Sequence, residues 1–256
     1  MFSASLKIVS VAGLGLALLL LIIFILPPMV EYLLEKRNAT PTEKRSSSDR
    51  VLRRYRNMGA YQRLFARFKL RLDPMFSELP SFLSCSDIRT VADIGCGYAV
   101  PACWILERFP EAMVYGIDPD PRRVRVASRA IGRRGVVAVA GAPDIPKTPG
   151  PVDLAMMFDI IHFLNDDQFN LTLKRLSVIL GQKGRLILRA TLPPAYRFAW
   201  VWWMENLRNK VAGIQCYYRS FEEIETIVLQ AGCDIELSAP SGSKGDLVWF
   251  ILNVRK

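Results

Sequence analysis

Two acidic residues and a pair of glycines have the types and spacing expected of a ligand site. Asp93 lies within a short apolar run, and Gly95 and Gly97 follow it directly. Glycine can adopt backbone angles closed to other residues and lets a ligand lie against the main chain. Asp118 ends a second apolar run about 20 residues downstream, the offset at which nucleotide-binding folds place a carboxylate on ribose hydroxyls. Gly-x-Gly alone would indicate only a tight turn, but together with the second acid it predicts a site for a nucleotide-like ligand.

To hold these residues in place, the chain must form a strand, a turn and a helix in succession. Residues 91–94 read as a buried strand and residues 101–109 as a helix, with a proline in its first turn, where the missing N–H costs little. Further elements alternate along the chain: predicted strands at 112–118, 135–141, 152–158 and 185–191, and predicted helices at 121–132 and 166–180. Such alternation predicts a parallel sheet covered by helices on both faces.

The C-terminal part departs from this alternation. Residues 220–232 open with Ser-x-x-Glu, a capping-box pattern, and end in glycine, which predicts a helix. Residues 234–239 and 246–254 then form two predicted strands joined by a Pro/Ser/Gly-rich turn, as in a hairpin. The predicted fold is therefore an α/β sheet, parallel except for an antiparallel C-terminal hairpin.

Length, charge and cysteine usage limit the function classes. A chain of 256 residues can bury one substantial core with about 70 to 80 residues left over. The net charge of +10 resides in residues 36–71, which hold 12 Lys or Arg against two acidic residues. Five cysteines, an odd number without paired spacing, predict a reducing compartment. With a single histidine and no Cys-x-x-Cys, a metal site is not expected.

An apolar run near the N-terminus predicts a membrane span. Residues 8–26 contain Ser10 as their only polar residue, and 19 residues reach across a bilayer core at about 1.5 Å per residue. The run is too long for a signal peptide, and no Ala-x-Ala site follows it before Pro27. Lys7 stands alone before the run while Lys and Arg crowd behind it, so we expect a single-pass membrane protein with its C-terminal bulk in the cytoplasm.

The basic segment behind this run divides into two parts. Residues 38–49 are polar and contain a proline, which is typical of a linker, and Asp49 is a candidate cap for the next helix. Residues 50–72 have apolar side chains at helical spacing among many arginines, which predicts a basic amphipathic helix broken at Gly59. Two placements stay open: on anionic lipid headgroups of the bilayer, or docked over the ligand cleft. Nucleic acid is disfavoured as a partner because the membrane span is adjacent.

Several motifs in order make the chain resemble the class I S-adenosylmethionine-dependent methyltransferases, over roughly residues 81–256. Residues 93–99 resemble the family's first motif, and residues 116–120 resemble the second. The resemblance implies S-adenosyl-L-methionine as cofactor, with the glycine turn beneath its methionine part, the first acid orienting it and the second holding the ribose, since a carboxylate can accept two hydrogen bonds from a vicinal diol. The implied cofactor-binding residues are Asp93, Gly95, Cys96, Gly97, Asp118 and Pro119. Ala99 occupies the third glycine position of the family.

Two later segments extend the resemblance. Residues 141–146 resemble the motif that meets the adenine; Ala142 stands where many members have an acid, and Asp144 is assigned in its place. Residues 158–164 resemble the stretch after the fourth strand, which implies that Phe158 and Asp159 belong to the cofactor pocket.

His162 is the candidate catalytic base by residue type, because an imidazole titrates near neutrality. The alternative, which we favour, is that it packs or forms hydrogen bonds structurally. No Asn-Pro-Pro-Tyr follows the fourth predicted strand, which argues against methylation of nucleobase amino groups. The aromatic segment 195–207 carries three of the five tryptophans and is the best candidate for acceptor recognition.

These observations predict three parts: a transmembrane anchor at 1–34, a linker with the basic helix at 35–80, and a methyltransferase domain at 81–256. The predicted function is methyl transfer from S-adenosylmethionine, preferentially to oxygen of a hydrophobic or lipid-linked small-molecule acceptor at the cytoplasmic membrane face. The alternative is a membrane-tethered assembly partner that keeps the fold but has lost turnover, in keeping with Ala99, Ala142 and the lack of a clear base.

Overall fold

The computed structural model describes residues 42–83, 87–193, 213–242 and 246–255, and residues 46–256 form one compact unit. The predicted membrane span at 8–26 and the aromatic segment at 195–207 lie outside the described residues. Among the helices that are described, none is both long and apolar enough to cross a bilayer. The membrane span therefore stays a prediction from sequence.

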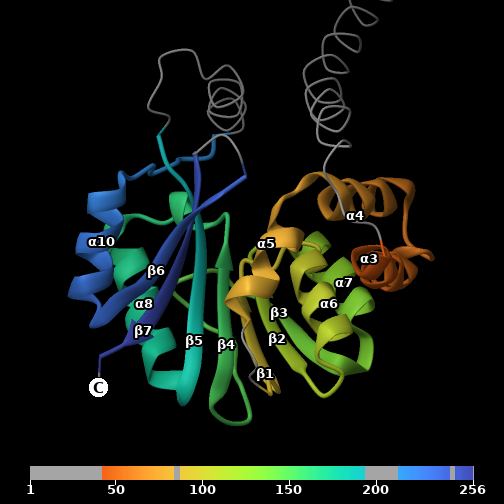
Figure 1. Cartoon of the computed structure of the whole chain (residues 1–256), viewed down its shortest axis with the longest axis horizontal. Helices are drawn as coiled ribbons and strands as arrows, with labels where there is room; N and C mark the ends of the chain where they lie inside the picture. The colour runs from red at the N-terminus through yellow and green to blue at the C-terminus, as the bar shows by residue number, and fades with distance from the viewer. Residues whose placement is uncertain (1–41, 84–86, 194–212, 243–245, 256) are drawn as a thin grey trace, which may run out of the picture. The chain divides into compact units, whose positions relative to one another are not determined.

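A seven-stranded sheet in the order β3-β2-β1-β4-β5-β7-β6 organises the unit (Figure 1). All neighbouring strands pair in parallel except at β7, which is antiparallel to both β5 and β6. The strands are β1 Thr90–Ile94, β2 Met113–Asp118, β3 Gly135–Val139, β4 Val152–Phe158, β5 Leu180–Thr191, β6 Cys233–Ser241 and β7 Leu247–Val254. The predicted α/β sheet and its C-terminal hairpin are confirmed, and the structure adds that β7 inserts between β5 and β6.

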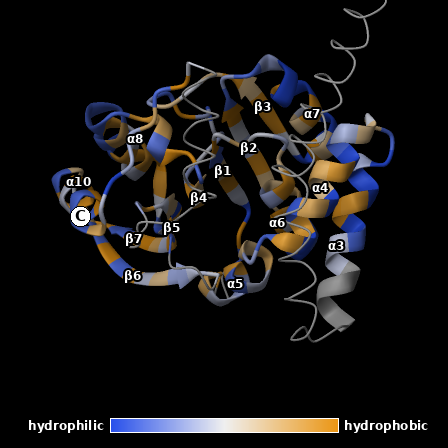
Figure 2. Ribbon diagram, turned by 90° about the horizontal axis from the view of Figure 1, so that it is seen from above, coloured by the Kyte–Doolittle hydropathy of each residue, from blue (hydrophilic) through white to orange (hydrophobic). Residues whose placement is uncertain are grey.

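Helices cover the sheet in two layers, with α8 and α10 on one face and α5, α6 and α7 on the other (Figures 1 and 2). The helices are α3 Thr42–Tyr55, α4 Ala60–Leu72, α5 Met75–Phe82, α6 Val100–Arg108, α7 Pro121–Ile131, α8 Asp166–Ile179 and α10 Phe221–Gln230, with short 3-10 turns η1 Gly132–Arg134 and η2 Ile161–Phe163. Alternate residues of the strands serve the two cores: Trp249 faces the α6 side and Phe250 the α8 side. This alternation follows from the two-residue repeat of a strand.

The predicted capping box at the start of α10 is present. Ser220 accepts a hydrogen bond from the amide of Glu223 (3.2 Å), and the Glu223 carboxylate accepts one from the amide of Ser220 (2.7 Å). This reciprocal pair satisfies two amides that the first helical turn leaves without partners.

The basic segment forms two helices, α3 and α4, separated at Gly59 as predicted. The predicted linker at 38–49 is wrong from Thr42 onward, because α3 begins there, and Asp49 lies inside α3 rather than capping a helix. Arginines of α3 make ion pairs within the domain: Arg54 Nε lies 2.8 Å from a carboxylate oxygen of Glu107 on α6. The charge of α3 thus contributes to docking on the α6 side of the sheet.

Candidate functional site

A cavity of about 450 Å³ opens at the carboxyl ends of β1, β2 and β4. The carboxyl edge of a parallel sheet is where α/β folds bind ligands, because the helices that follow the strands begin there. Most of the predicted cofactor residues line the cavity: Asp93, Gly95, Cys96, Gly97, Asp118, Pro119, Phe158 and Asp159. The structure therefore brings together residues from the two acidic strand ends, the glycine turn and the segment after β4.

The glycine turn needs its glycines for steric reasons. Gly95 and Gly97 have φ angles of 71° and 56°, in the left-handed region that favours glycine. A Cβ on Gly95 would lie 2.5 Å from Cγ2 of Ile160, so a side chain there would collide with the loop after β4. The amides of Gly95 and Cys96 donate to the carbonyl of Ile117 at the end of β2 (2.8 and 2.9 Å), which holds the turn against the second acidic strand end.

Asp118 is buried, with 2% of its surface exposed, and its carboxylate is oriented by backbone amides. The amide of Gly97 donates to Oδ2 (3.0 Å) and the amide of Asp120 donates to Oδ1 (2.9 Å). Arg123 lies farther from it, with Nη1 at 3.9 Å from Oδ2. A carboxylate has about four acceptor positions, so these two amide bonds leave capacity for hydroxyl donors of a ligand.

Asp93 is the buried acid at the floor of the site. It is 3% exposed, and its Oδ2 has no hydrogen-bond partner among the described residues. Burial, together with the charge of Asp118, raises the pKa of Asp93 to about 7. A buried carboxylate without a partner is costly when ionised, and a cationic ligand would remove that cost.

These features fit S-adenosylmethionine. Its methionine part carries an ammonium and a sulfonium, which would complement Asp93, and its ribose diol would complement the oriented carboxylate of Asp118. The glycine turn leaves the main chain accessible between the two acids, where a Cβ at Gly97 would meet no atom within 4 Å. Asp93, Asp118 and the glycine turn therefore form a set of residues that fits this cofactor.

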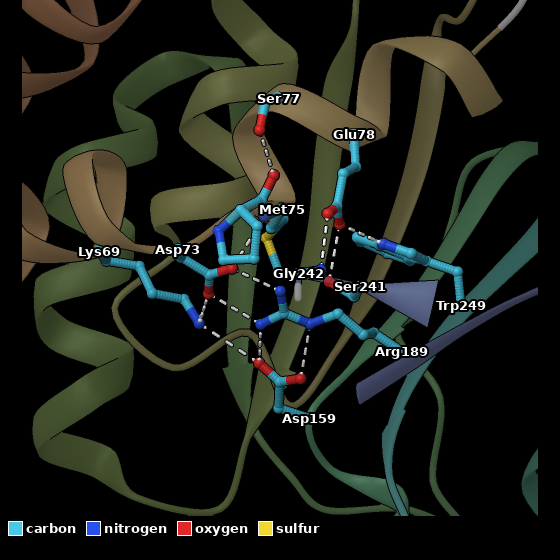
Figure 3. A network of polar contacts seen from close by, with 11 residues as sticks. Lys69, Asp73, Met75, Ser77, Glu78, Asp159, Arg189, Ser241, Gly242 and Trp249 are labelled. Carbon is cyan, nitrogen blue, oxygen red and sulfur yellow. Dashed lines mark hydrogen bonds and ion pairs between the residues drawn. The ribbon is translucent and has the colours of Figure 1, made fainter. Parts of the chain in front are cut away.

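On the other side of the cavity lies a cluster of four charged side chains, which Figure 3 shows from close by. Arg189 on β5 is 2% exposed and forms paired contacts with two carboxylates, Asp73 (2.5 and 2.8 Å) and Asp159 (2.5 and 2.8 Å). Lys69 on α4 places its Nζ 2.5 Å from Asp73 and 3.3 Å from Asp159. We call Lys69, Asp73, Asp159 and Arg189 the ionic cluster; its two positive and two negative charges balance.

The ionic cluster keeps Asp159 ionised. Burial by itself would raise the pKa of Asp159, but the charges of Arg189 and Lys69 outweigh it, and this pKa lies below its usual value. Asp159 also has a φ of 59°, which is uncommon for a residue other than glycine, and the contacts with Arg189 fix it in this conformation. A carboxylate with a lowered pKa is a poor proton acceptor, so Asp159 is suited to orient a ligand rather than to act as a base.

Two helices outside the predicted domain core complete the cavity wall. Phe65 and Lys69 on α4 and Met75 on α5 line it. The Phe65 ring stacks edge-on against Tyr98 of that turn, with 5.1 Å between ring centroids. Tyr55 at the end of α3 donates a hydrogen bond from its hydroxyl to the Tyr98 carbonyl (2.6 Å). The basic helices therefore pack on the domain at the ligand cleft, one of the two placements left open by the sequence.

α5 is tied to the sheet by a second polar contact, also visible in Figure 3. Glu78 accepts hydrogen bonds from Nε1 of Trp249 (2.7 Å), from Oγ of Ser241 (2.7 Å) and from the amide of Gly242 (2.8 Å). Trp249 in turn lies beneath the Arg189 guanidinium, 5.4 Å from ring centroid to Cζ. The segment that carries Asp73 and Met75 is thus fixed at both ends.

Two predicted site residues lie elsewhere. Asp144 is exposed and forms an ion pair with Arg175 (3.1 Å); it is not among the residues that line the cavity, whereas Gly141 and Ala142 are. His162 is also absent from the lining, and its ring stacks on Tyr218 with centroids 5.4 Å apart. Burial lowers the pKa of His162 to about 4, so the imidazole is neutral at physiological pH. This geometry favours the packing role, and a catalytic role for His162 stays a prediction.

Lys69, Asp73 and Arg189 are the members of the ionic cluster that sequence reasoning missed. Arg189 carried a signal, since a charged residue in the middle of the apolar run Leu-Ile-Leu-Arg-Ala requires a buried partner. Lys69 carried none, because it is one of many basic residues on an amphipathic helix and lies 90 residues before Asp159.

Comparison with known proteins agrees with this geometry. Residues 91–184, from β1 into β5, match the family described as Methyltransferase domain. A search of curated protein sequences finds no match to the chain. This match confirms, for residues 91–184, the predicted enzyme class, a methyltransferase that uses S-adenosylmethionine.

Solved structures share the fold at low sequence identity. The structure of LaPhzM is 20% identical with a TM-score of 0.56, and the match covers 76% of this chain and 57% of that one. Mitomycin 7-O-methyltransferase MmcR is 16% identical with a TM-score of 0.58, and the match covers 83% of this chain and 69% of that one. NcsB1, an O-methyltransferase from neocarzinostatin biosynthesis solved with S-adenosylmethionine and 2-hydroxy-5-methyl naphthoic acid, is 16% identical with a TM-score of 0.57, covering 89% and 68%. The chain thus spans between about three fifths and two thirds of the length of these proteins.

Proposed function

We propose that this protein transfers the methyl group of S-adenosylmethionine to an oxygen atom of a hydrophobic small molecule. The observation that carries the proposal is one cavity with two unlike walls. Asp93, Asp118 and the glycine turn form a wall suited to the cofactor, and Phe65, Met75 and Phe158 supply apolar surface. The bound cofactor supplies an electrophilic methyl group, so the protein must mainly align the acceptor with it.

An acidic, phenol-like hydroxyl fits this cavity best. His162 does not line it, and the ionic cluster lowers the pKa of Asp159, so neither residue is well placed to remove a proton from an ordinary alcohol. The Lys69 ammonium has three N–H donors, of which Asp73 and Asp159 occupy two, so the third would favour the phenolate form of a bound acceptor. The ligand named in complex with NcsB1, 2-hydroxy-5-methyl naphthoic acid, carries a hydroxyl of this kind.

Lys69→Met tests the role of this charge. We expect kcat to fall about 10- to 100-fold, because loss of the cation raises the pKa of the bound phenol by about one to two units and lowers its phenolate fraction accordingly, while the Kd for S-adenosylmethionine stays unchanged. Lys174→Met on α8, outside the cavity lining, is the matched control and should leave both constants unchanged. A weakened cofactor Kd in Lys69→Met with unchanged kcat would show that Lys69 serves the cofactor instead.

We also propose that the domain works at the cytoplasmic face of a membrane, on a hydrophobic or lipid-linked acceptor. Support comes from the sequence: the apolar run at 8–26, the single lysine before it and the basic residues behind it. Cys96, Cys103 and Cys233 are free thiols, which is compatible with a reducing compartment. Protease protection in sealed vesicles tests the orientation: residues 46–256 should be digested only from the cytoplasmic side.

Methyl transfer from labelled S-adenosylmethionine to a membrane extract tests the activity and reports the acceptor class. We expect labelled, base-stable product in the lipid-soluble fraction, and none with Asp118→Ala. If the purified protein showed no cofactor binding by calorimetry and Asp118→Ala changed nothing, the enzyme proposal would fail. Cofactor binding without any transfer would favour the alternative role as a membrane-tethered assembly partner.

A further inference from the structure

The helix α4 has two apolar faces, and only one of them is buried. Ala66 and Leu70 pack into the core, whereas Tyr61, Leu64 and Phe68 are 65%, 50% and 52% exposed. At 100° per residue, the exposed residues point away from the side that carries the buried ones. Large apolar side chains gathered on one exposed helical stripe indicate a surface that is covered by a partner.

The charges beside this exposed stripe indicate what kind of partner it fits. Arg63, Arg67 and Arg71 recur at four-residue spacing along one flank of the stripe, and all three are exposed. Among the described residues, no acidic side chain forms an ion pair with any of them. Arg56, directly after α3, lines a groove together with Arg63, Leu64 and Arg67. The surface therefore combines exposed apolar side chains with a row of unneutralised guanidinium groups.

We propose that this face of α4 binds the surface of an anionic lipid bilayer. The exposed Tyr61, Leu64 and Phe68 would enter the boundary between headgroups and acyl chains, and the arginines would contact lipid phosphates. An acidic protein would also complement the arginines, but the apolar run at 8–26, which the sequence predicts to span a membrane, places a bilayer close to α4 along the chain. A lipid surface is therefore the occupant that the observations favour.

The placement of α4 gives this contact a consequence for the reaction. Phe65 and Lys69 belong to the same helix and line the cavity, so the helix that would rest on lipid is also a wall of the site. A hydrophobic acceptor dissolved in the bilayer would then reach the cavity without crossing water. The inference uses the proposed membrane location, but it does not depend on methyl transfer.

Hydrogen exchange of the full chain in lipid nanodiscs tests the proposal. Two kinds of disc are compared, one of phosphatidylcholine alone and one containing phosphatidylglycerol as well, without cofactor or acceptor. We expect the amides of residues 60–72 to exchange about ten-fold more slowly in the anionic discs, since each arginine at such a surface changes binding by roughly five-fold. The amides of α8 and α10 should exchange equally in both.

Three variants decide the interpretation. Leu64→Ser with Phe68→Ser, and separately Arg63→Gln with Arg67→Gln, should each abolish the slower exchange in anionic discs. Leu171→Ser with Val178→Ser removes exposed apolar residues from α8, which are 40% and 83% exposed, and should retain it.

Two results would overturn the proposal. Equal exchange of α4 in both kinds of disc would show that anionic lipid makes no contact with this face. Protection of α4 that appears only after a protein-containing membrane fraction is added would assign the face to a protein partner. Because no methyl transfer is measured, either result leaves the proposed activity standing.

Discussion

Replacing Asp93 by asparagine should stabilise the cofactor-free protein, and by more at high pH than at low pH. The side chain is 3% exposed, Oδ2 lacks a partner, and burial beside Asp118 raises the pKa of Asp93 to about 7 from a usual value near 3.8. The folded state therefore holds this proton more tightly than the unfolded state does. The stability that the bound proton provides is present at low pH and is lost as the pH rises from about 4 to about 7.

The size of the effect follows from the shift in pKa. Each unit corresponds to about 1.4 kcal/mol, so the raised pKa of Asp93 lowers the free energy of unfolding by about 1.7 kcal/mol at pH 5 and by about 4.3 kcal/mol at pH 8, relative to a carboxyl with its usual pKa. Asparagine has nearly the same shape and never ionises, so the stability difference between Asp93→Asn and the parent protein should grow by about 2.5 kcal/mol between these pH values. For a domain of this size, that is about 5–10 °C in Tm.

Thermal unfolding of the detergent-solubilised full chain at pH 5 and pH 8 measures this difference. Asp87→Asn, which changes an exposed carboxylate, is the control and should give a difference in Tm that does not vary with pH. S-adenosylmethionine would bring positive charge close to Asp93, so it should stabilise the parent protein and not the variant. Its addition should therefore reduce the difference in Tm between the two proteins at pH 8. The assignment of Asp93 as a buried acid without a partner would be refuted if the difference in Tm between Asp93→Asn and the parent stayed constant with pH or grew at low pH.

Three further predictions concern the parts that position the site. Arg189→Leu leaves two buried carboxylates without their shared cation and should lower the free energy of unfolding by about 3–5 kcal/mol, seen as a lower Tm; an unchanged Tm would show that the ionic cluster is not formed. Gly95→Ala should abolish cofactor binding in calorimetry because its Cβ meets Ile160 at 2.5 Å, and adding Ile160→Ala should restore part of it unless the positive φ alone is decisive. Tyr55→Phe removes the 2.6 Å hydrogen bond to the Tyr98 carbonyl and should lower the free energy of unfolding by about 1–3 kcal/mol; a Tm equal to that of the parent protein would contradict this.

The elements of the domain could be predicted because their signals are local. The strand of β4 and the capping box of α10 depend on residues a few positions apart, and so does the glycine turn after β1. The two acids at the ends of β1 and β2 meet in one cavity because parallel strands end at the same edge of a sheet. Hydrophobic periodicity and the direction of the strands were therefore sufficient to predict which backbone segments form the cofactor side of the cavity.

The rest depends on contacts between distant segments, which periodicity does not encode. The hairpin pattern in the sequence is compatible with either β6 or β7 next to β5, and the structure has β7 there. Likewise, the sequence does not show that His162 turns toward Tyr218 instead of the cavity, since a 3-10 turn of three residues gives no amphipathic signal. The start of α3 at Thr42 runs through a Ser-rich stretch that reads as a linker by composition.

The least expected feature is that one helix outside the matched family segment has three roles, each on its own side. α4 buries Ala66 and Leu70 against the domain, lines the cavity with Lys69, and exposes Leu64 and Phe68. Lys69 pairs with Asp159 after β4, and Asp73 at the C-terminal cap of α4 pairs with Arg189 on β5, so a movement of α4 that widened the cavity would have to break these two contacts first. A partner that binds the exposed face of α4 therefore contacts the same rigid helix that lines the cavity with Phe65 and Lys69. In this arrangement, the residues proposed to hold the cofactor lie mostly within the segment that matches the family, whereas the helix proposed to face the acceptor lies outside it.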